Sequence, residues 1–342
     1  MSIVETGGAQ TGEAALHGAL AAHLAELRID AEEYRVEVGG QRVEAPDPIA
    51  FRAQLTTALY EHWHAGTAGR EAAPAHHRDT AFERELAAAT PHSAAATPAT
   101  LRALPDDAVS GQAVVEVNRV RVRVPAGMVA GSTPGDALVL NLPAVRPMLS
   151  PGFLFAGGSA GGNRGKEVLR MYVHLSTSEH APAVWRALLE VLEGHGARYR
   201  AKVLSRRTSY PRRDAVVLYL PEESRPHVPD LVRAVEGLPG LGAATPVLAR
   251  AVRPGLAMAW EPADERPGWR RVSFGQHRAM AVTRGIFRHM SDGVPLHSAV
   301  AEELTAAGVD PEDPARNLDS SAFPDPGAPA AHDPAGLAAV PA

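Results

Sequence analysis

The stretch between Arg170 and Tyr219 constrains the fold more than any other part of the 342-residue sequence. RMYVHL has the pattern of a strand, residues 179–194 that of an amphipathic helix, and RYRAKVLS and RRDAVVLYLP those of two further strands. Strands and helices in such an order pack as layers around a shared core. The sequence therefore predicts an α+β fold, with a mixed, largely antiparallel sheet flanked by helices and a helical N-terminal region.

The same three strands concentrate polar side chains. Because alternate side chains of a strand share a face, three groups of neighbours are expected. They are Arg170, Tyr172 and His174; Arg198, Arg200 and Lys202; and Arg213 and Tyr219. Arginine holds a phosphate but keeps its proton, whereas lysine becomes a base when its surroundings lower its pKa. Several arginines with one lysine, one histidine and a tyrosine therefore suit chemistry on a phosphorylated substrate.

Composition excludes several classes of protein. The chain has no cysteine, which rules out disulfides, a thiolate nucleophile and a cysteine-based zinc site. We find neither a secretory signal nor a run of about 20 apolar residues, so we expect a cytoplasmic protein without a membrane partner. The formal net charge of −5 argues against a protein that coats nucleic acid.

The sequence divides into four predicted regions. They are a helical N-terminal region (1–64), a mobile linker or lid (65–110), an α+β core (111–309) and a disordered tail rich in Pro and Ala (310–342). In the first region we expect a helix over 11–28, a hairpin at Gly39-Gly40, and a helix that opens at Asp47 and Pro48. DTAFERELAAAT predicts one short helix within the linker.

Within the core, VVEVNRVRVRVP alternates and predicts one half-buried strand, with Val120, Val122 and Val124 facing inward. ALVLNLP is expected to be its neighbour in the sheet. The remaining predicted elements are helices at 226–237, at 296–307 and from Ser273 onward, and a strand at 255–261.

The polar residues also have simpler interpretations. His174 lies between apolar residues, so its position fits a core histidine as well as one lining a cleft. Lys202 fits a solvated basic strand face, and Tyr219 fits an aromatic at the end of a buried strand. The segment 198–213 holds seven basic residues in 16. That local positive field suits a phosphate or phosphopeptide, but also a nucleic-acid groove or simple solubility.

Other candidate sites lie outside these strands. SFGQHR opens a helix, and the N–H groups of a helix start favour an anion. Arg278 and His277 would face a phosphate there, or else lie on an ordinary surface. The histidine pairs at 62/64 and 76/77 have no carboxylate at a recognisable spacing, so we predict no metal site.

Five blocks of the sequence carry a resemblance to a known family. They are FRAQLTTALYEHWH, RPMLSPGFLFAGGS, RMYVHL, VLSRRTSYPRRDAVVLYLP and PGLAMAWEPADERPGWRRVSFGQHR. Together they resemble the HopA-type effector family over roughly residues 45–320, and YPRRDAVVLYLP and SFGQHR are the most specific. Bacterial relatives in that family include the stand-alone lyases of class V lanthipeptide and thioamitide biosynthesis.

The phosphothreonine lyases of pathogens are more distantly similar. They carry a Lys-x-His on a strand, a further lysine on the strand after the next helix, and a tyrosine on the following strand. By this resemblance the histidine corresponds to His174, the second lysine to Lys202 and the tyrosine to Tyr219. Tyr172 stands where those enzymes have the proton-abstracting lysine. Lys202 is therefore the expected base, with Tyr172 and Lys166 as fallbacks.

The resemblance implies a carbon–oxygen lyase that removes phosphate from phosphoserine or phosphothreonine in a precursor peptide, leaving dehydroalanine or dehydrobutyrine. Lys202 would be the base and His174 the acid, assisted by Tyr219 and Tyr172. The residues expected to bind phosphate are Arg213, Arg212 and Arg278, with Arg170, Arg200, Arg206 and His277 as further candidates. The reaction needs no cofactor and no metal.

The expected partners are a leader-bearing precursor peptide, a Ser/Thr peptide kinase that supplies the phosphate, and a cyclase; nucleic acid and membrane are not expected. Two alternatives remain open at this point. The missing Lys-x-His lysine favours a non-catalytic phosphopeptide- or partner-binding module. The basic segment 198–213 leaves room for an RNA-binding protein.

Overall fold

The computed structural model describes residues 16–70, 78–104, 111–162, 165, 167–270 and 272–329. The chain forms two compact units. Unit 1 comprises Met1–Arg70, Pro246–Ala251 and Ala259–Ser321, and unit 2 comprises Glu71–Thr245, Val252–Met258 and Ala322–Ala342. Outside the described residues lie Lys166, His76-His77, the first residues of the helix predicted at 11–28 and the end of the predicted tail.

Unit 1 combines helices with a small antiparallel sheet. Its elements are α1 (Gly18–Ala25), β1 (Arg28–Asp30), β2 (Arg35–Val38), β3 (Gln41–Glu44), α2 (Pro48–Leu59) with its π-helical continuation η1 (Tyr60–Ala65), α6 (Phe274–Asp292) and α7 (Leu296–Ala306). The predicted hairpin is confirmed, because β2 and β3 pair around Gly39 and Gly40, which both have positive φ. Asp47 caps α2 as expected: its side chain accepts the N–H groups of Ile49 and Ala50, each at 2.9 Å.

The start of α6 is also as predicted. Ser273 Oγ accepts the backbone N–H of Gln276 at 3.3 Å, and the Gln276 side chain accepts the N–H of Ser273 at 3.2 Å. This reciprocal capping box satisfies two N–H groups that the helix leaves without partners. α6 packs against α2 and α7, so the apolar side chains of these helices form the core of unit 1.

A seven-stranded sheet in the order β13-β14-β10-β12-β11-β9-β8 lies mostly in unit 2, and its strands β13 and β14 include residues of both units. Its strands are β8 (Val145–Ser150), β9 (Phe153–Gly157), β10 (Leu169–Leu175), β11 (Arg200–Leu204), β12 (Arg212–Leu220), β13 (Arg250–Arg253) and β14 (Leu256–Trp260). The three strands predicted between Arg170 and Tyr219 are confirmed as β10, β11 and β12. β12 lies between the other two and is antiparallel to both.

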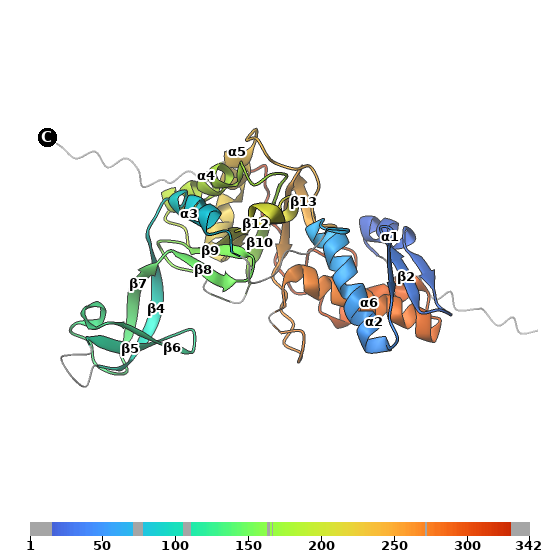
Figure 1. Cartoon of the computed structure of the whole chain (residues 1–342), viewed down its shortest axis with the longest axis horizontal. Coiled ribbons are helices and arrows are strands. Elements are labelled where there is room, and N and C mark those ends of the chain that lie inside the picture. Colours follow the sequence, from blue (N-terminus) through green and yellow to red (C-terminus); the bar gives the residue numbers. More distant parts are fainter. Residues whose placement is uncertain are drawn as a thin grey trace, which may run out of the picture. The chain divides into compact units, whose positions relative to one another are not determined.

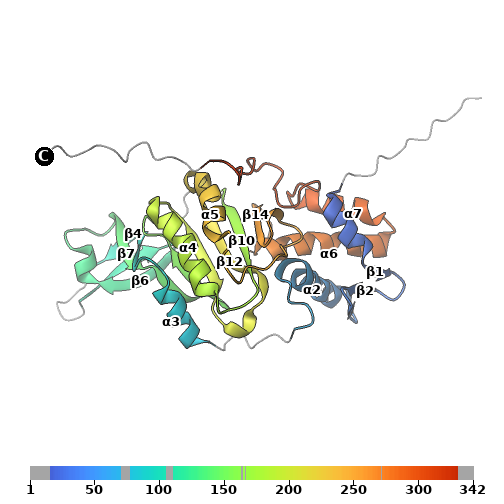
Figure 2. The same ribbon diagram turned by 90° about the horizontal axis from the view of Figure 1, so that it is seen from above.

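Helices cover one side of this sheet. α4 (Ala181–Gly194) and α5 (Val228–Val235) lie over strands β10 and β12 in Figure 2, and Figure 1 shows them on the same side of these strands. Alternate residues of the three central strands are apolar and fully buried, among them Met171, Val203 and Leu218. The remaining alternate residues belong to the opposite face, and this is the face that carries the polar side chains.

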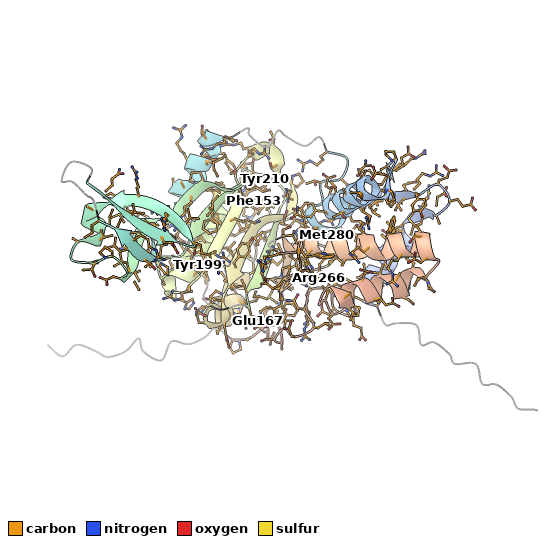
Figure 3. The ribbon with its side chains drawn as sticks, turned by 90° about the horizontal axis from the view of Figure 1, so that it is seen from below. Phe153, Glu167, Tyr199, Tyr210, Arg266 and Met280 are labelled. Carbon is orange, nitrogen blue, oxygen red and sulfur yellow. The ribbon has the colours of Figure 1, made fainter. Side chains whose placement is uncertain are left out.

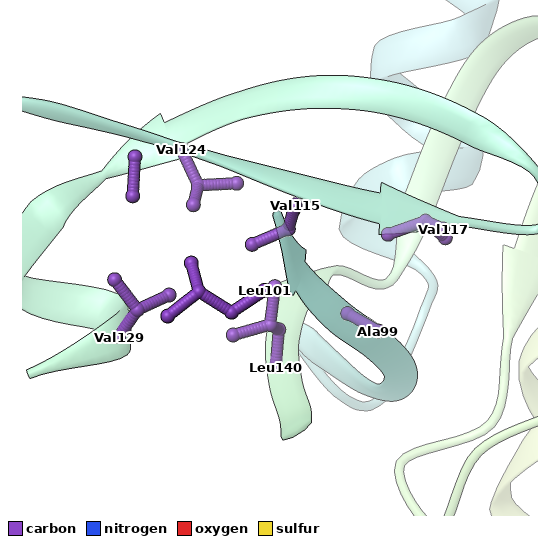
Figure 4. Packing of buried hydrophobic residues seen from close by; sticks show 8 residues of the cluster. Ala99, Leu101, Val115, Val117, Val124, Val129 and Leu140 are labelled. Carbon is purple, nitrogen blue, oxygen red and sulfur yellow. The ribbon is translucent and has the colours of Figure 1, made fainter. Parts of the chain in front are cut away.

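A second sheet of four strands, in the order β6-β5-β4-β7, has its own small core. Its strands are β4 (Ala94–Ala103), β5 (Gln112–Val117), β6 (Val120–Pro125) and β7 (Ala137–Pro143), with the short helix η2 (Ala126–Val129) beside them. Figure 4 shows its packed side chains, which include Leu101, Val115, Val129 and Leu140. The buried residues come from one face of the sheet, as expected for an antiparallel sheet whose other face is exposed to solvent.

The prediction of a single strand over VVEVNRVRVRVP is wrong. The segment is a hairpin of β5 and β6 that turns at Asn118 and Arg119, whose φ angles are 51° and 67°. A two-residue turn with positive φ matches the twist of a hairpin, and asparagine tolerates that conformation. Of the three valines expected to face inward, Val124 is buried and Val122 half-buried, but Val120 is 59% exposed. ALVLNLP pairs with β4 instead of with this hairpin.

The range 65–110, predicted as a linker or lid, contains the following two regular elements among residues 66–70 and 78–104, which the structure describes. One is the expected short helix α3 (Thr80–Ala88), capped by Asp79, whose side chain accepts the N–H of Phe82 at 3.0 Å. The other is β4, which pairs with β7 from Ala94 to Thr100.

The predicted α+β class is confirmed by the helices and the three antiparallel sheets. Among the described residues, no helix has both the length and the apolar character needed to cross a bilayer.

Candidate functional site

Tyr219 lies at the centre of a cationic group on the polar face of the large sheet. Its position in β12 is paired with Arg170 of β10 on one side and with Arg200 of β11 on the other. Directly paired residues project from the same face of a sheet, so all three share the polar face. The Arg170 guanidinium carbon lies 5.0 Å from the centroid of the Tyr219 ring and that of Arg200 5.5 Å from it. The ring therefore stabilises two guanidinium groups close to one another.

Lys202 belongs to the next row of the same face. Its partner in β12 is Val217, which in turn pairs with Tyr172 of β10. The ammonium nitrogen of Lys202 lies 4.3 Å from the centroid of the Phe153 ring and 6.0 Å from that of Tyr219. Lys202 is half-buried, whereas Tyr172 is only 1% exposed. This row of the sheet therefore has an accessible lysine, Lys202, at its β11 end and a buried aromatic, Tyr172, at its β10 end.

His174 occupies an irregular point of β10. The register between β10 and β12 shifts between Val173 and Leu175, so that His174 has no register partner in β12. Its backbone N–H donates to Gly255 O at 2.8 Å and its carbonyl accepts from the N–H of Gly242 at 3.0 Å. Such bulges re-aim a side chain and recur beside functional sites.

The His174 ring is fixed by two contacts. Its Nδ1–H donates to the carbonyl of Ala244 at 2.9 Å, because a carbonyl can only accept, and Nε2 is therefore the nitrogen left for chemistry. A Cβ atom added at Gly242 would lie 2.3 Å from the ring, so glycine is required for this close approach. Burial lowers the pKa of His174 below its ordinary value, and the nearby charge of Arg213 lowers it further.

The other basic residues of the segment have distinct surroundings. Arg212 donates from Nε and Nη2 to the two carboxylate oxygens of Asp214 at 2.7 and 2.8 Å, so its fork is already engaged by a buried acid. Arg213 is half-buried, and burial lowers its pKa. Arg206 is also half-buried and precedes the short helix η3 (Arg207–Ser209). The charge of Arg213 also acts on His174, because it lowers the pKa of that histidine.

Arg278 and His277 are placed in unit 1, whereas the other candidates belong to unit 2. Both are 0% exposed. Arg278 donates to the carbonyls of Pro314 (2.8 Å) and Arg316 (3.2 Å) and to Asn317 Oδ1 (2.9 Å). A side chain engaged in this way holds protein segments together, so we leave both residues out of the proposed phosphate site.

His277 completes that internal network. Its Nδ1 accepts from Arg278 at 2.9 Å and its Nε2–H donates to Asp264 Oδ2 at 3.1 Å, which defines a neutral imidazole. Burial, with the charge of Arg278, lowers the pKa of His277 to about 4. Burial opposes ionisation of Asp264, but hydrogen bonds from Arg266 and His277 bring its pKa down to about 2. Arg266 is labelled in Figure 3.

Sequence reasoning missed two residues of the site. Phe153, labelled in Figure 3, comes from β9, which pairs with β11 far along the chain and thereby places the ring against Lys202. Gly242 lies in a loop with no motif of its own. Neither residue has a local signal, because both act through long-range pairing that the spacing of residues does not encode.

The fold and this face define an α+β protein that presents lysine, arginine and histidine side chains together on one face of a β-sheet. The sequence model of the HopA1 effector protein family matches residues 144–316, and the chain belongs to this family. The match includes β8 to β12 and every residue of the cationic group described above.

Two solved structures are similar to the chain. The effector protein from Pseudomonas syringae pv. tomato strain DC3000 is 17% identical, with 80% of this chain and 91% of that chain covered and a TM-score of 0.47. The effector protein from Pseudomonas syringae pv. syringae strain 61 is 14% identical, with coverage of 77% and 98% and a TM-score of 0.40. No curated protein matches the sequence.

Proposed function

We propose that the protein is a phosphoserine/phosphothreonine lyase that eliminates phosphate from a precursor peptide in lanthipeptide-type biosynthesis. The observation that carries the proposal is the shared face of Arg170, Tyr219, Arg200 and Lys202, with His174 aimed by the adjacent bulge. Two strand spacings separate β10 from β11, about 10 Å, which long arginine and lysine side chains bridge. A phosphorylated side chain fits between such groups.

The reaction proposed here is a β-elimination. Lys202 Nζ removes the proton from Cα of the phosphorylated residue, and the electron pair forms the Cα=Cβ double bond. The Cβ–O bond breaks, and its electrons leave with the phosphate. His174 Nε2 donates a proton to the departing oxygen, so the products are a dehydroamino acid and hydrogen phosphate. Arg170 and Arg200 neutralise the charge that grows on this phosphate.

The electrostatics of His174 are consistent with a general acid that becomes protonated when its phosphorylated substrate binds. In the free protein, burial and Arg213 lower the pKa of His174. A phosphate dianion placed beside Arg213 and His174 would offset that positive charge and favour the imidazolium form. Tyr219 would assist by holding the two guanidinium groups. Tyr172 is buried and would help to position the proposed base, Lys202.

The phosphate must come from another enzyme, because elimination only consumes it. We therefore keep a Ser/Thr peptide kinase, a leader-bearing precursor and a cyclase as the proposed partners. Arg213 is the proposed additional phosphate ligand. Arg206 and Arg212 are assigned supporting positions, since Arg212 is already paired with Asp214.

The test is intact mass spectrometry of a leader-bearing phosphothreonine peptide incubated with the purified full-length protein. We expect the loss of phosphoric acid and the appearance of a thiol-reactive dehydro residue. Lys202→Ala and His174→Ala should each lower turnover by about 10²–10⁴-fold. Arg84→Ala, which removes an exposed arginine of α3, is the matched control and should leave turnover unchanged. Loss of phosphate with retention of water would indicate a phosphatase and contradict the proposal.

A non-catalytic phosphopeptide-binding module is the second candidate, and one observation favours it. Tyr172, which replaces the base of distantly similar lyases, is a buried aromatic. For such a module, no turnover would be detected even with the cognate kinase present. Binding of the phosphopeptide would depend on Arg200 but survive Lys202→Ala and His174→Ala.

A further inference from the structure

Three metal-ligating side chains gather where α4 ends and α5 begins, away from the residues of the proposed lyase site. His195 is the C-cap of α4. His227 is the last residue of η4 (Glu222–His227) and the N-cap of α5, and Asp230 lies in the first turn of α5. One ligand atom of each residue lies within 4.8 Å of the other two. His227 and Asp230 are three residues apart at a helix start, a spacing that places both on one side of the helix.

Two polar atoms of this cluster are buried without a hydrogen bond. Within the described residues, neither His227 Nδ1 nor Asp230 Oδ2 has a hydrogen-bond partner. His195 Nε2 lies 3.2 Å from Asp230 Oδ2, but the two atoms are not aligned for a hydrogen bond. A buried polar atom without a partner costs about 1–3 kcal/mol, so some group is expected to satisfy these atoms. A cation placed among the three side chains would satisfy both.

The chemistry of the donors selects the ion. Two imidazoles and one carboxylate are a donor set that zinc uses in proteins, with a fourth position left to water or another ligand. Zinc bonds of about 2.0–2.2 Å require donor atoms roughly 3.3 Å apart, so donor atoms that now lie within 4.8 Å of one another have to approach by up to about 1.5 Å. His195 can supply that movement, because it is exposed and follows the end of the helix. Its ring is stacked on that of His227, with the centroids 4.1 Å apart.

Arg233 gives the carboxylate a defined orientation. Its guanidinium forms an ion pair with Asp230 Oδ1, which leaves Oδ2 directed to the histidines. In a metal-bound carboxylate, one oxygen usually binds the ion while the other accepts a hydrogen bond from a neighbouring side chain. The Asp230 side chain is 16% exposed and that of His195 29% exposed, so an ion can enter from solvent.

We propose that His195, His227 and Asp230 bind one divalent ion of the zinc class, which ties the end of α4 to the start of α5. These helices cover one side of the large sheet. The ion is therefore structural: it would stabilise the layer behind the proposed site and takes no part in phosphate elimination. The inference does not depend on the lyase proposal.

The test is a titration of the metal-stripped full-length protein with Co²⁺, followed by its visible absorption, and then with Zn²⁺ by calorimetry. The wild type is expected to bind one ion per chain and to gain the absorption of four- or five-coordinate Co²⁺. His227→Ala and Asp230→Asn should each weaken binding by about 100-fold or more. His297→Ala, which removes a histidine of α7, should leave the affinity unchanged.

Folding of the variants is checked by circular dichroism, and the melting temperature supplies a second readout. Zn²⁺ should raise the Tm of the wild type and of His297→Ala, but not that of Asp230→Asn, which keeps the shape of the side chain. The absence of stoichiometric binding in the wild type would overturn the proposal. Binding that is equally tight in His227→Ala and Asp230→Asn would also overturn it, since the ion would then belong to other histidines.

Discussion

Two groups of arginines in this protein look alike in the sequence and differ in the structure. Arg170 and Arg200 converge on Tyr219 in unit 2, where Arg200 is exposed and Arg170 is 4% exposed. Arg278 of unit 1 is fully buried and hydrogen-bonded to three carbonyl or amide oxygens and a histidine. Arg200 and Arg278 both lie in strongly basic stretches of the sequence. An arginine-rich motif therefore indicates a ligand site only where at least one guanidinium group remains accessible to a ligand, as that of Arg200 does.

The largest expected difference between the two groups is in stability. Arg278→Ala leaves four buried or part-buried hydrogen-bonding groups without their partner, and we expect it to destabilise unit 1 by about 3–5 kcal/mol. Arg200→Ala removes an exposed side chain and should change stability by no more than about 0.5 kcal/mol. Thermal unfolding of both variants measures the contrast. Equal melting temperatures would remove the distinction between the two groups.

The second expectation concerns the loss of folding stability at acidic pH. The pKa of His277 is about 4 in the folded protein, below the ordinary value of 6.5. Between these values the unfolded chain binds more protons, so stability should be complete above about pH 6.5 and fall as the pH drops towards 4. The loss is on the order of 3 kcal/mol. The lowered pKa of Asp264, about 2 against 3.8, extends the loss to lower pH.

This acid sensitivity can be isolated with a variant. His277→Gln keeps a hydrogen-bonding side chain but does not titrate, so it should lose clearly less stability between pH 6.5 and 4 than the wild type does. His174→Gln in unit 2 is the control and should leave the acid sensitivity of unit 1 in place. Denaturant unfolding followed across this pH range provides the measurement, and an unchanged slope in His277→Gln would contradict the assignment.

The third expectation sharpens the description of the unit 2 site. Gly242→Ala introduces a Cβ at 2.3 Å from the His174 ring, so the ring has to move. A displacement of about 1 Å costs on the order of 100-fold in turnover. Gly127→Ala, where the added Cβ meets nothing within 4 Å, is the matched control. Phosphopeptide affinity should be nearly unchanged in Gly242→Ala; a loss of affinity without a loss of turnover would reassign His174 to binding.

The smallest expected effect is that of the Tyr219 ring. Each of the two arginine contacts with the ring contributes about 0.5–1 kcal/mol, so Tyr219→Leu should weaken phosphopeptide binding by about 5- to 30-fold. Tyr219→Phe keeps the ring and should bind as the wild type does. Calorimetry gives the affinities, and turnover of the phenylalanine variant then tests the hydroxyl: a fall in turnover at constant affinity would assign it a catalytic role.

The local elements of the protein follow from residues that are close together in the sequence. The β10, β11 and β12 strands, the capped helices α2 and α6, and the hairpin at Gly39-Gly40 follow from periodicity, caps and turn residues, which act over a few positions. The family resemblance, too, came from short blocks of sequence. The turn at Asn118 and Arg119 was missed because alternation continues across it, although its residues favour positive φ.

Which side chains meet depends on long-range contacts in the folded chain. Strand order brought Phe153 to Lys202, a bulge re-aimed His174 against Gly242, and the contacts of Arg278 removed it from the surface. The cluster of His195, His227 and Asp230 was likewise absent from the sequence prediction, because its residues come from the ends of different helices. Pairing and burial depend on residues far apart in the chain, and no local pattern records them.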